Sequence, residues 1–190
     1  MDIVEFDTRT GPIDGMQIVT MKQVTDERGT IRELYRRSAF DSIGVDLGAF
    51  AQINVTESRY GAVRGMHAEA MTKLVAVASG EALGVYIDLR PDSPTRGEID
   101  TVTLHSGVQV LVPAGVANGF QSLSEICQYV YCFDTEWRPG MPGQACTPLD
   151  PSIAHLWPVP IDADEPTQIS AKDVAAPTLA ALLDDSEDTP

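Results

Sequence analysis

The chain has 190 residues, 43% of them hydrophobic, and its 28 acidic and 13 basic side chains give a formal net charge of −15. Such a chain is long and apolar enough to fold around a sizeable core. The excess of carboxylates argues against a nucleic-acid or anionic-membrane surface, because those partners require a spread of Lys and Arg. An anionic small molecule would need a local basic pocket.

Short runs rich in β-branched residues recur between turn signals along most of the chain. They lie at residues 16–24, 50–55, 73–79, 82–89, 99–104, 108–113 and 126–133. In the run at 82–89, large apolar side chains fall on every second position, which is the period of a half-buried strand. The regular spacing of these runs predicts an all-β sandwich or barrel.

Helix is predicted at two places only. The segment "SAFDSIG" (38–44) begins with a Ser suited to an N-cap, and "APTLAALL" (176–183) has a Pro in its first turn. We expect one domain over residues 1–183, with these short helices at its periphery. The ending "DDSEDTP" (184–190) is acidic and is expected to be disordered.

The cysteines and the N-terminus bear on the compartment. Cys127, Cys132 and Cys146 give no even disulfide framework, so reduced thiols are the simplest interpretation. The start "MDIVEFDTRTG" has neither a basic nor an apolar signal region, and no apolar stretch approaches the length that spans a bilayer. We therefore expect a cytoplasmic protein with no membrane partner.

The stretch "AVRGMHAEAMTKLV" (62–75) gathers Arg64, His67 and Lys73. Residues three apart normally face opposite sides of a strand, so Arg64 and His67 reach one cavity only if the alternation is broken. Gly65 between them indicates a bulge that would do this. The alternative is a surface Arg beside a His satisfied in the core.

Two further strands carry polar groups in register with apolar ones. Lys73 shares a face with Val75 and Val77, so its amine either reaches out to water at an edge or enters a cavity. Tyr129, Tyr131 and Phe133 likewise share one face of the run at 126–133. Such an aromatic stripe is more often core packing than chemistry.

A metal site is the next question. "HAE" (67–69) and "PAGVAN" (113–118) resemble the two motif regions of the cupin superfamily, whose metal-binding members cluster several His and a carboxylate. Asn118 stands where the second region would supply a ligand His. His67 with Glu69 alone is a poor transition-metal site, because such sites normally recruit two or more imidazoles. We therefore expect a metal-free pocket.

An ordered series of motifs runs over residues 12 to 180. It consists of "DERG" (26–29), "FAQINV" (50–55), "RGMH" (64–67), "KLV" (73–75), "DLRPDSPTRG" (88–97), "VPAGVANGF" (112–120), "YVYCFDTEW" (129–137), "DP" (150–151) and "ISAKD" (169–173). Taken together, this series resembles the dTDP-4-dehydrorhamnose 3,5-epimerases and related dTDP-sugar epimerases. The resemblance implies a cupin-type jelly roll, a homodimer and a dTDP-4-keto-6-deoxyhexose substrate.

The same resemblance implies roles for individual residues. His67 would be the general base, Tyr131 the opposing general acid, Asp173 the partner of His67, and Lys73 the group that stabilises an enolate. These types suit epimerisation beside a ketone, which needs a base, an acid on the opposite face and a cation near the enolate oxygen. No cofactor is required.

Substrate-binding residues follow in the same way. Trp137 stands where the family commonly stacks a Tyr on thymine, and Asn118 replaces a substrate-contacting His. Other departures are Pro142, Cys132 and a short 67–73 loop. The residues that would hold the nucleotide and its diphosphate are Arg28, Glu33, Gln52, Asn54, Arg64 and Lys172.

Several functions stay open at this point. The first is metal-independent epimerisation at C3, C5 or both. Within enzymes, the alternatives are a mono-epimerase or a ketoisomerase on a related dTDP-sugar, and a metal-dependent cupin oxygenase, which Asn118 argues against. From another class, the alternative is a catalytically silent sugar-nucleotide-binding cupin. The presence of both a base and an acid disfavours that last alternative, because binding alone requires neither.

Overall fold

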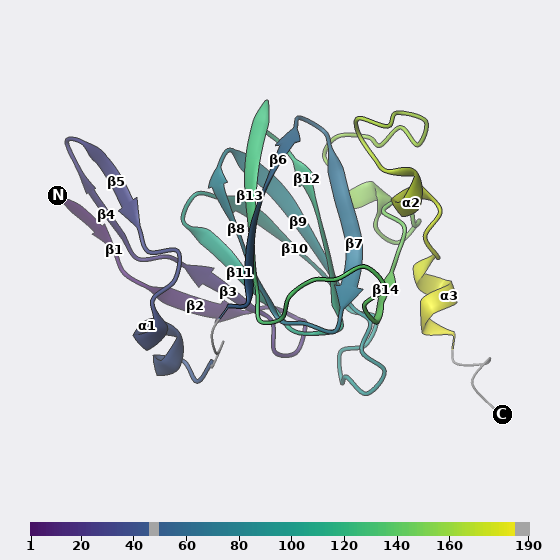
Figure 1. Cartoon of the computed structure of the whole chain (residues 1–190), viewed down its shortest axis with the longest axis horizontal. Helices are drawn as coiled ribbons and strands as arrows, with labels where there is room; N and C mark the ends of the chain where they lie inside the picture. The colour runs from purple at the N-terminus through teal and green to yellow at the C-terminus, as the bar shows by residue number, and fades with distance from the viewer. Residues whose placement is uncertain (46–49, 185–190) are drawn as a thin grey trace.

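The computed structural model describes residues 1–45 and 50–184 of the chain. Two facing antiparallel sheets form its body (Figure 1). The first sheet has the strand order β10-β9-β12-β7-β14. Its strands are β7 (Val63–Glu69), β9 (Glu81–Asp88), β10 (Ile99–His105), β12 (Val116–Ser122) and β14 (Gly143–Ala145).

The second sheet has six strands in the order β2-β3-β11-β8-β13-β6, so that β6 is an edge strand. Side chains from the two sheets meet between them, as where Phe120 on β12 stacks on Tyr129 of β13 with ring centroids 3.9 Å apart. The strands are β2 (Asp7–Thr10), β3 (Gln17–Thr20), β6 (Gln52–Arg59), β8 (Lys73–Ser79), β11 (Val108–Val112) and β13 (Ile126–Phe133).

A small third sheet, with the order β1-β4-β5, projects from one end of the body, and we call it the N-terminal arm (Figure 1). The C-terminal helices lie at the opposite end, beside β14. The arm contains β1 (Asp2–Val4), β4 (Gln23–Asp26) and β5 (Gly29–Arg32). The helices are α1 (Arg37–Ser42), η1 (Ala154–Leu156), α2 (Ala171–Val174) and α3 (Leu179–Leu183).

The predicted all-β jelly roll with short peripheral helices is confirmed, and the differences are local. The run at 16–24 forms two strands, β3 and β4, which belong to different sheets. Strand β12 has no predicted counterpart, because all its residues are buried and a strand covered on both faces lacks a period of two.

Both predicted helix starts are wrong. Helix α1 begins at Arg37, after an Arg36 cap without a side-chain hydrogen bond, so Ser38 lies inside the helix. Helix α3 begins after Thr178, whose hydroxyl accepts the Ala181 N–H, and Pro177 therefore precedes the cap. Of the tail predicted at 184–190, residues 185–190 lie outside the described residues.

The three cysteines are free and buried. Burial raises the pKa of the Cys127 and Cys132 thiols to about 11 and that of the Cys146 thiol to about 12, so all three are protonated at neutral pH. Among the described residues, no helix is long and apolar enough to cross a membrane.

Candidate active site

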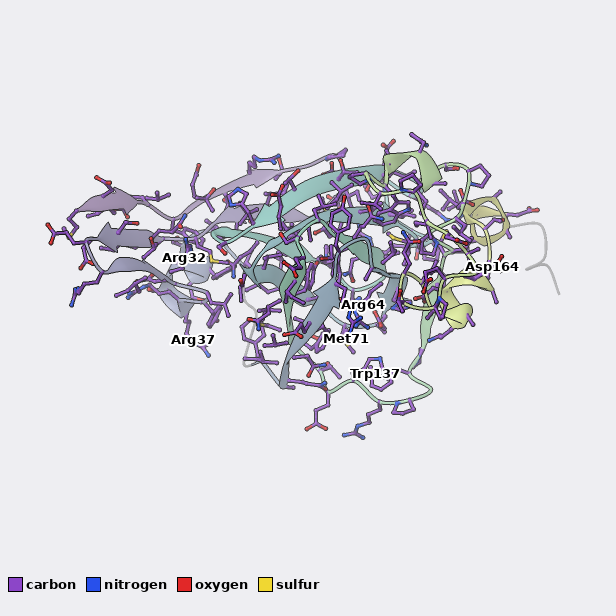
Figure 2. The ribbon with its side chains drawn as sticks, turned by 90° about the horizontal axis from the view of Figure 1, so that it is seen from above. Arg32, Arg37, Arg64, Met71, Trp137 and Asp164 are labelled. Atoms are coloured by element: carbon purple, nitrogen blue, oxygen red, sulfur yellow. The ribbon has the colours of Figure 1, made fainter. Side chains whose placement is uncertain are left out.

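An open cavity of about 170 Å³ lies between the two sheets. It receives side chains from β6, β8 and β13 of one sheet and from β7 and β12 of the other. Of its lining residues, Arg64 lies near the middle of the molecule in Figure 2, and Trp137 lies below it at the lower edge of that view. The full lining is Asn54, Thr56, Arg64, His67, Glu69, Lys73, Asn118, Tyr131, Phe133 and Trp137.

A bulge in β7 turns Arg64 and His67 into this one cavity. The β7–β12 register pairs His67 with Asn118 but Arg64 with Phe120, so β7 has one extra residue in this interval. Gly65 has a φ of +122°, and a Cβ there would lie 2.5 Å from the Cα of Gly119. The predicted bulge at Gly65 is confirmed, and the alternative of a surface Arg beside a core His is excluded.

His67 is held by a carboxylate from the far end of the sequence. Its Nε2 lies 2.8 Å from Oδ1 of Asp173, which is carried by α2 after its Ser170 cap. Burial acts to raise the pKa of Asp173, but hydrogen bonds with His67 and Ser170 outweigh it and the pKa is lowered. An ionised Asp173 accepts the Nε2–H, which leaves Nδ1 of the neutral ring as the basic nitrogen.

Lys73 points into the cavity, and its side chain is only 3% exposed. Of the two options that the sequence left open, the structure therefore shows an amine that enters a cavity and not one that reaches out to water at an edge. The ammonium donates to the backbone oxygen of His67 at 3.1 Å, to Oδ1 of Asn118 at 2.7 Å and to the carboxylate of Glu69. Burial lowers the pKa of Lys73, and the negative charge of Glu69 opposes that shift.

Tyr131 reaches the cavity from the opposite sheet. It lies on β13 between Val75 and Asn54 in the sheet register, and its ring contacts Tyr129 and Phe133 at centroid distances of 4.8 and 5.6 Å. The predicted shared face of these three aromatic residues is thus confirmed. Burial raises the pKa of Tyr131 although the charge of Arg64 acts against the shift, so the phenol is protonated at neutral pH.

Polar side chains continue from the cavity toward solvent. The Trp137 backbone N–H donates to Oε1 of Gln52 at 2.8 Å, and Gln52 in turn donates to Oδ1 of Asn54 at 3.0 Å. Arg64 donates to the Ser58 hydroxyl at 3.0 Å. Lys172 lines an adjoining pocket, to which Trp137 and His67 also contribute.

Two predicted binding residues lie elsewhere. Arg28 and Glu33 belong to the N-terminal arm, where Arg28 pairs with Asp26 at 2.6 Å and Glu33 pairs with Arg36. In Figure 2, Arg32 of this arm lies well away from Arg64 and Trp137. Within one copy of the chain, Arg28 and Glu33 do not line the cavity, because the arm points away from it. That they bind substrate stays a prediction.

Sequence reasoning missed Glu69 as a site residue. Its signal was present, since Glu69 lies two positions after His67 and therefore shares its face of the strand. From the sequence, Glu69 is considered only as a metal ligand, beside His67. Among the described residues, no group of three or more His, Cys, Asp or Glu side chains is placed to hold a metal ion.

Comparison with known proteins gives a consistent set of relatives. The family profile of dTDP-4-dehydrorhamnose 3,5-epimerase matches residues 10–181. The Salmonella typhimurium dTDP-4-dehydrorhamnose 3,5-epimerase is 33% identical over 90% of this chain and 94% of its own length. A dTDP-4-dehydro-6-deoxyglucose 3-epimerase from Streptomyces bikiniensis is also 33% identical, over 82% of this chain and 80% of its own.

Solved structures agree with the sequence relatives. The Legionella pneumophila epimerase in complex with dTDP-4-keto-L-rhamnose superposes with a TM-score of 0.83 and 31% identity, over 95% of both chains. A 4-keto-6-deoxy sugar epimerase from the novobiocin cluster of Streptomyces spheroides gives the same TM-score at 29% identity, over 94% of this chain and 89% of its own. The shared jelly roll and the profile match over most of the sequence show that this chain belongs to the dTDP-4-dehydrorhamnose 3,5-epimerase family of isomerases.

Proposed function

We propose that this chain epimerises a dTDP-4-keto-6-deoxyhexose at C3, C5 or both, without a metal or another cofactor, in deoxysugar biosynthesis. One observation carries the proposal. His67, oriented by Asp173, and Tyr131 enter one cavity from two facing sheets, and Lys73 lies in the same cavity. A substrate between the sheets would have a base on one face and an acid on the other, as inversion at carbon requires.

The reaction follows from the protonation states of these groups. Nδ1 of His67 takes the proton from the carbon beside the ketone, and the C–H electron pair moves into the enolate, with its negative charge on the carbonyl oxygen. Lys73 stabilises that charge with its ammonium. The Tyr131 phenol then donates its proton to the opposite face of the carbon and restores the ketone. The phenolate and imidazolium exchange protons with solvent before the next turnover.

The nucleotide would lie toward the open side of the cavity. Arg64 and Lys172 supply positive charge for the diphosphate, and the half-exposed indole of Trp137 offers a face to thymine. Known relatives support the class of ligand, since the Legionella pneumophila structure contains dTDP-4-keto-L-rhamnose and a Streptococcus suis structure contains dTDP-D-xylose.

We also propose a homodimer whose two N-terminal arms exchange. Edge strand β6 exposes Ile53 and Val55, and the arm exposes Ile3, Val4 and Ile31, so each copy offers two apolar surfaces that a second copy would cover. In such a dimer, Arg28 and Glu33 would reach the cavity of the other copy. The free buried thiols fit a reduced, cytoplasmic location.

The test is solvent isotope exchange with dTDP-4-keto-6-deoxyglucose in deuterated water. The wild type should incorporate deuterium at each carbon that it inverts, which separates a mono-epimerase from a 3,5-epimerase. His67→Asn should lose both deuterium incorporation and product. Tyr131→Phe should still exchange while net inversion is lost, because His67 can return a solvent deuteron to the original face.

Two results would contradict the proposal. If the wild type binds dTDP but exchanges deuterium at neither carbon, the silent binding protein is the better account. If His67→Asn exchanges as fast as the wild type, His67 is not the base. Metal analysis of the purified protein, with activity measured after chelation, checks the metal-independent claim, which is wrong if a divalent ion restores lost activity.

A further inference from the structure

All three N–H groups of the Lys73 ammonium have acceptors in the structure. They are the backbone oxygen of His67, the amide oxygen of Asn118 and the carboxylate of Glu69. An ammonium has three donors and no acceptor, so this environment suits the protonated form of the amine. A substrate oxygen that receives a hydrogen bond from Lys73 must share or replace one of these acceptors.

The three acceptors differ in freedom and in charge. The His67 oxygen is part of the β7 backbone, and Asn118 is 4% exposed on the central strand β12. The Glu69 side chain is 20% exposed at the cavity wall, on the last residue of β7. It is also the only one of the three that carries a negative charge. Glu69 therefore has the negative charge that attracts the ammonium. Its partly exposed side chain can also move aside when a substrate oxygen accepts a hydrogen bond from Lys73.

We propose that Glu69 is a positioning residue, the counter-ion that keeps Lys73 charged and fixes its ammonium at the cavity wall. The proposal rests on the proposed function, in which Lys73 stabilises an enolate. It adds that the positive charge of Lys73 depends on the carboxylate of Glu69. From the sequence alone, Glu69 was considered only as a metal ligand.

The surroundings of Lys73 make such a counter-ion necessary. Burial lowers its pKa, and a neutral amine would give an enolate little stabilisation. The neighbouring strands β11 and β12 carry no ionisable side chain. The remaining ionisable groups around it are Arg64 and His67 on β7, Tyr131 on β13, Asp173 behind His67 and Asp134 just after β13.

None of these groups replaces Glu69. Arg64 disfavours a second cation, and Asp173 is engaged with His67. Asp134 accepts the backbone N–H of Thr72 at 3.1 Å. Tyr131 is neutral at neutral pH because its pKa is raised by burial. Glu69 is thus the carboxylate that directly pairs with Lys73.

The charge of Lys73 can be measured without any assay of turnover. The chain has three lysines, Lys22, Lys73 and Lys172, so protein labelled with ¹³C at the lysine ε-carbon gives three signals that single substitutions assign. Glu69→Gln keeps the shape and removes the charge. The titration midpoint of Lys73 should fall by about one to three pH units, the effect of an opposite charge at contact distance.

A matched control separates the local effect of Glu69 on the Lys73 titration midpoint from the effect of a general change in net charge. Glu81→Gln removes an exposed carboxylate at the start of β9 and should leave the Lys73 midpoint in place. If Glu69→Gln does not fold, Glu69→Asp keeps the charge with a shorter reach, and it should give a smaller fall than the Gln substitution is expected to give. An unchanged Lys73 midpoint in every folded Glu69 variant overturns the proposal.

The pH profile of kcat/KM then connects the counter-ion to the reaction. Activity requires protonated Lys73, so the alkaline limb of Glu69→Gln should move to lower pH by the same amount as the NMR midpoint. If the midpoint moves and the alkaline limb does not, Glu69 is still the counter-ion, but the enolate role of Lys73 in the proposed function is wrong. The counter-ion role of Glu69 and the enolate role of Lys73 are therefore contradicted by different results.

Discussion

The cavity and the N-terminal arm both contain charged pairs, but the pairs are of different kinds. In the cavity, His67 pairs with Asp173 across 106 positions of sequence, and Lys73 bonds Asn118 across 45. In the arm, Arg28 pairs with Asp26 two positions away. These two cavity contacts thus depend on the complete fold, whereas the arm pair forms within one turn of the chain. The Lys73–Glu69 ion pair of the cavity is also close in sequence, but it joins the end of β7 to the start of β8.

The difference has an energetic consequence. Exposed local ion pairs contribute little to stability, because water screens them and two flexible side chains must be held. Breaking one partner of a pair that is shielded from water costs more, because the remaining group then lacks a partner in a poorly solvated place. Arg28 can therefore exchange Asp26 for another anion at little cost, while the cavity groups are held in place before substrate arrives.

The largest expected effect is in the pair that spans the longest sequence distance. Asp173→Asn presents an amide to Nε2 of His67 and no longer fixes the tautomer, so kcat should fall about 10³- to 10⁴-fold with little change in dTDP affinity. Steady-state kinetics and calorimetry measure the two quantities. Asp164→Asn, on the exposed segment before α2, is the control. An equal loss of dTDP affinity would show that Asp173 supports binding instead of the base.

The next effect compares the same substitution in the two regions. Lys73→Met removes the cavity cation and should lower kcat about 10²- to 10³-fold, the loss typical of one donor to a developing oxyanion. Lys22→Met removes an exposed lysine that pairs with Glu5 near the arm, and kcat should stay near the wild-type value. The interpretation of Lys73 is contradicted if both variants keep wild-type kcat.

The two regions were also unequally predictable from the sequence. Strand β9 was predictable from the period of two in its large apolar residues. The prediction that this strand is half-buried is wrong, because the residues from Gly84 to Asp88 are buried on both faces of the sheet. The spacing of Arg64 and His67 around Gly65 indicates the bulge, but it leaves a surface Arg beside a core His as an alternative that the structure had to exclude. The contact of His67 with Asp173 could come only from a family resemblance, since no local pattern links positions so far apart in the chain.

Arg28 and Glu33 show a different limit. Family motifs can identify residues that meet a substrate, but a linear sequence does not say which copy of the chain supplies them. In the structure, Arg28 and Glu33 do not line the cavity of their own copy. Glu69 shows the reverse case. The period of two already places its side chain on the same face of β7 as His67, but from the sequence it is considered only as a metal ligand and not as the partner of Lys73.

A smaller effect is expected at the mouth of the cavity. Trp137→Ala should weaken dTDP binding by about 1–3 kcal/mol, the range for bases stacked on aromatic side chains. Trp137→Phe keeps an aromatic face and should lose less. Calorimetric titration with dTDP measures both. Unchanged affinity in the alanine variant would remove Trp137 from the nucleotide site.

The smallest effect decides whether the arm belongs to the active site at all. Arg28→Ala should weaken dTDP binding about tenfold, the value of one charge-assisted hydrogen bond. The informative experiment is to co-express Arg28→Ala with His67→Asn. If each arm serves the other copy, a mixed dimer contains one site with both native residues and one site with neither.

Random pairing makes half of the dimers mixed, so activity should recover to about a quarter of the wild-type value at low substrate concentration. The matched control co-expresses His67→Asn with Tyr131→Phe. Both of these residues line the cavity of their own chain, so no mixed site is complete and activity should not recover. If activity recovers to about a quarter in the first mixture and does not recover in the control, the arm of one copy contributes Arg28 to the cavity of the other copy. If Arg28 is an ordinary surface residue, every Arg28→Ala chain keeps a complete cavity, and the first mixture should instead show about half of the wild-type activity. That result, with wild-type activity of Arg28→Ala alone, would confine the active site to the cavity side chains of one chain.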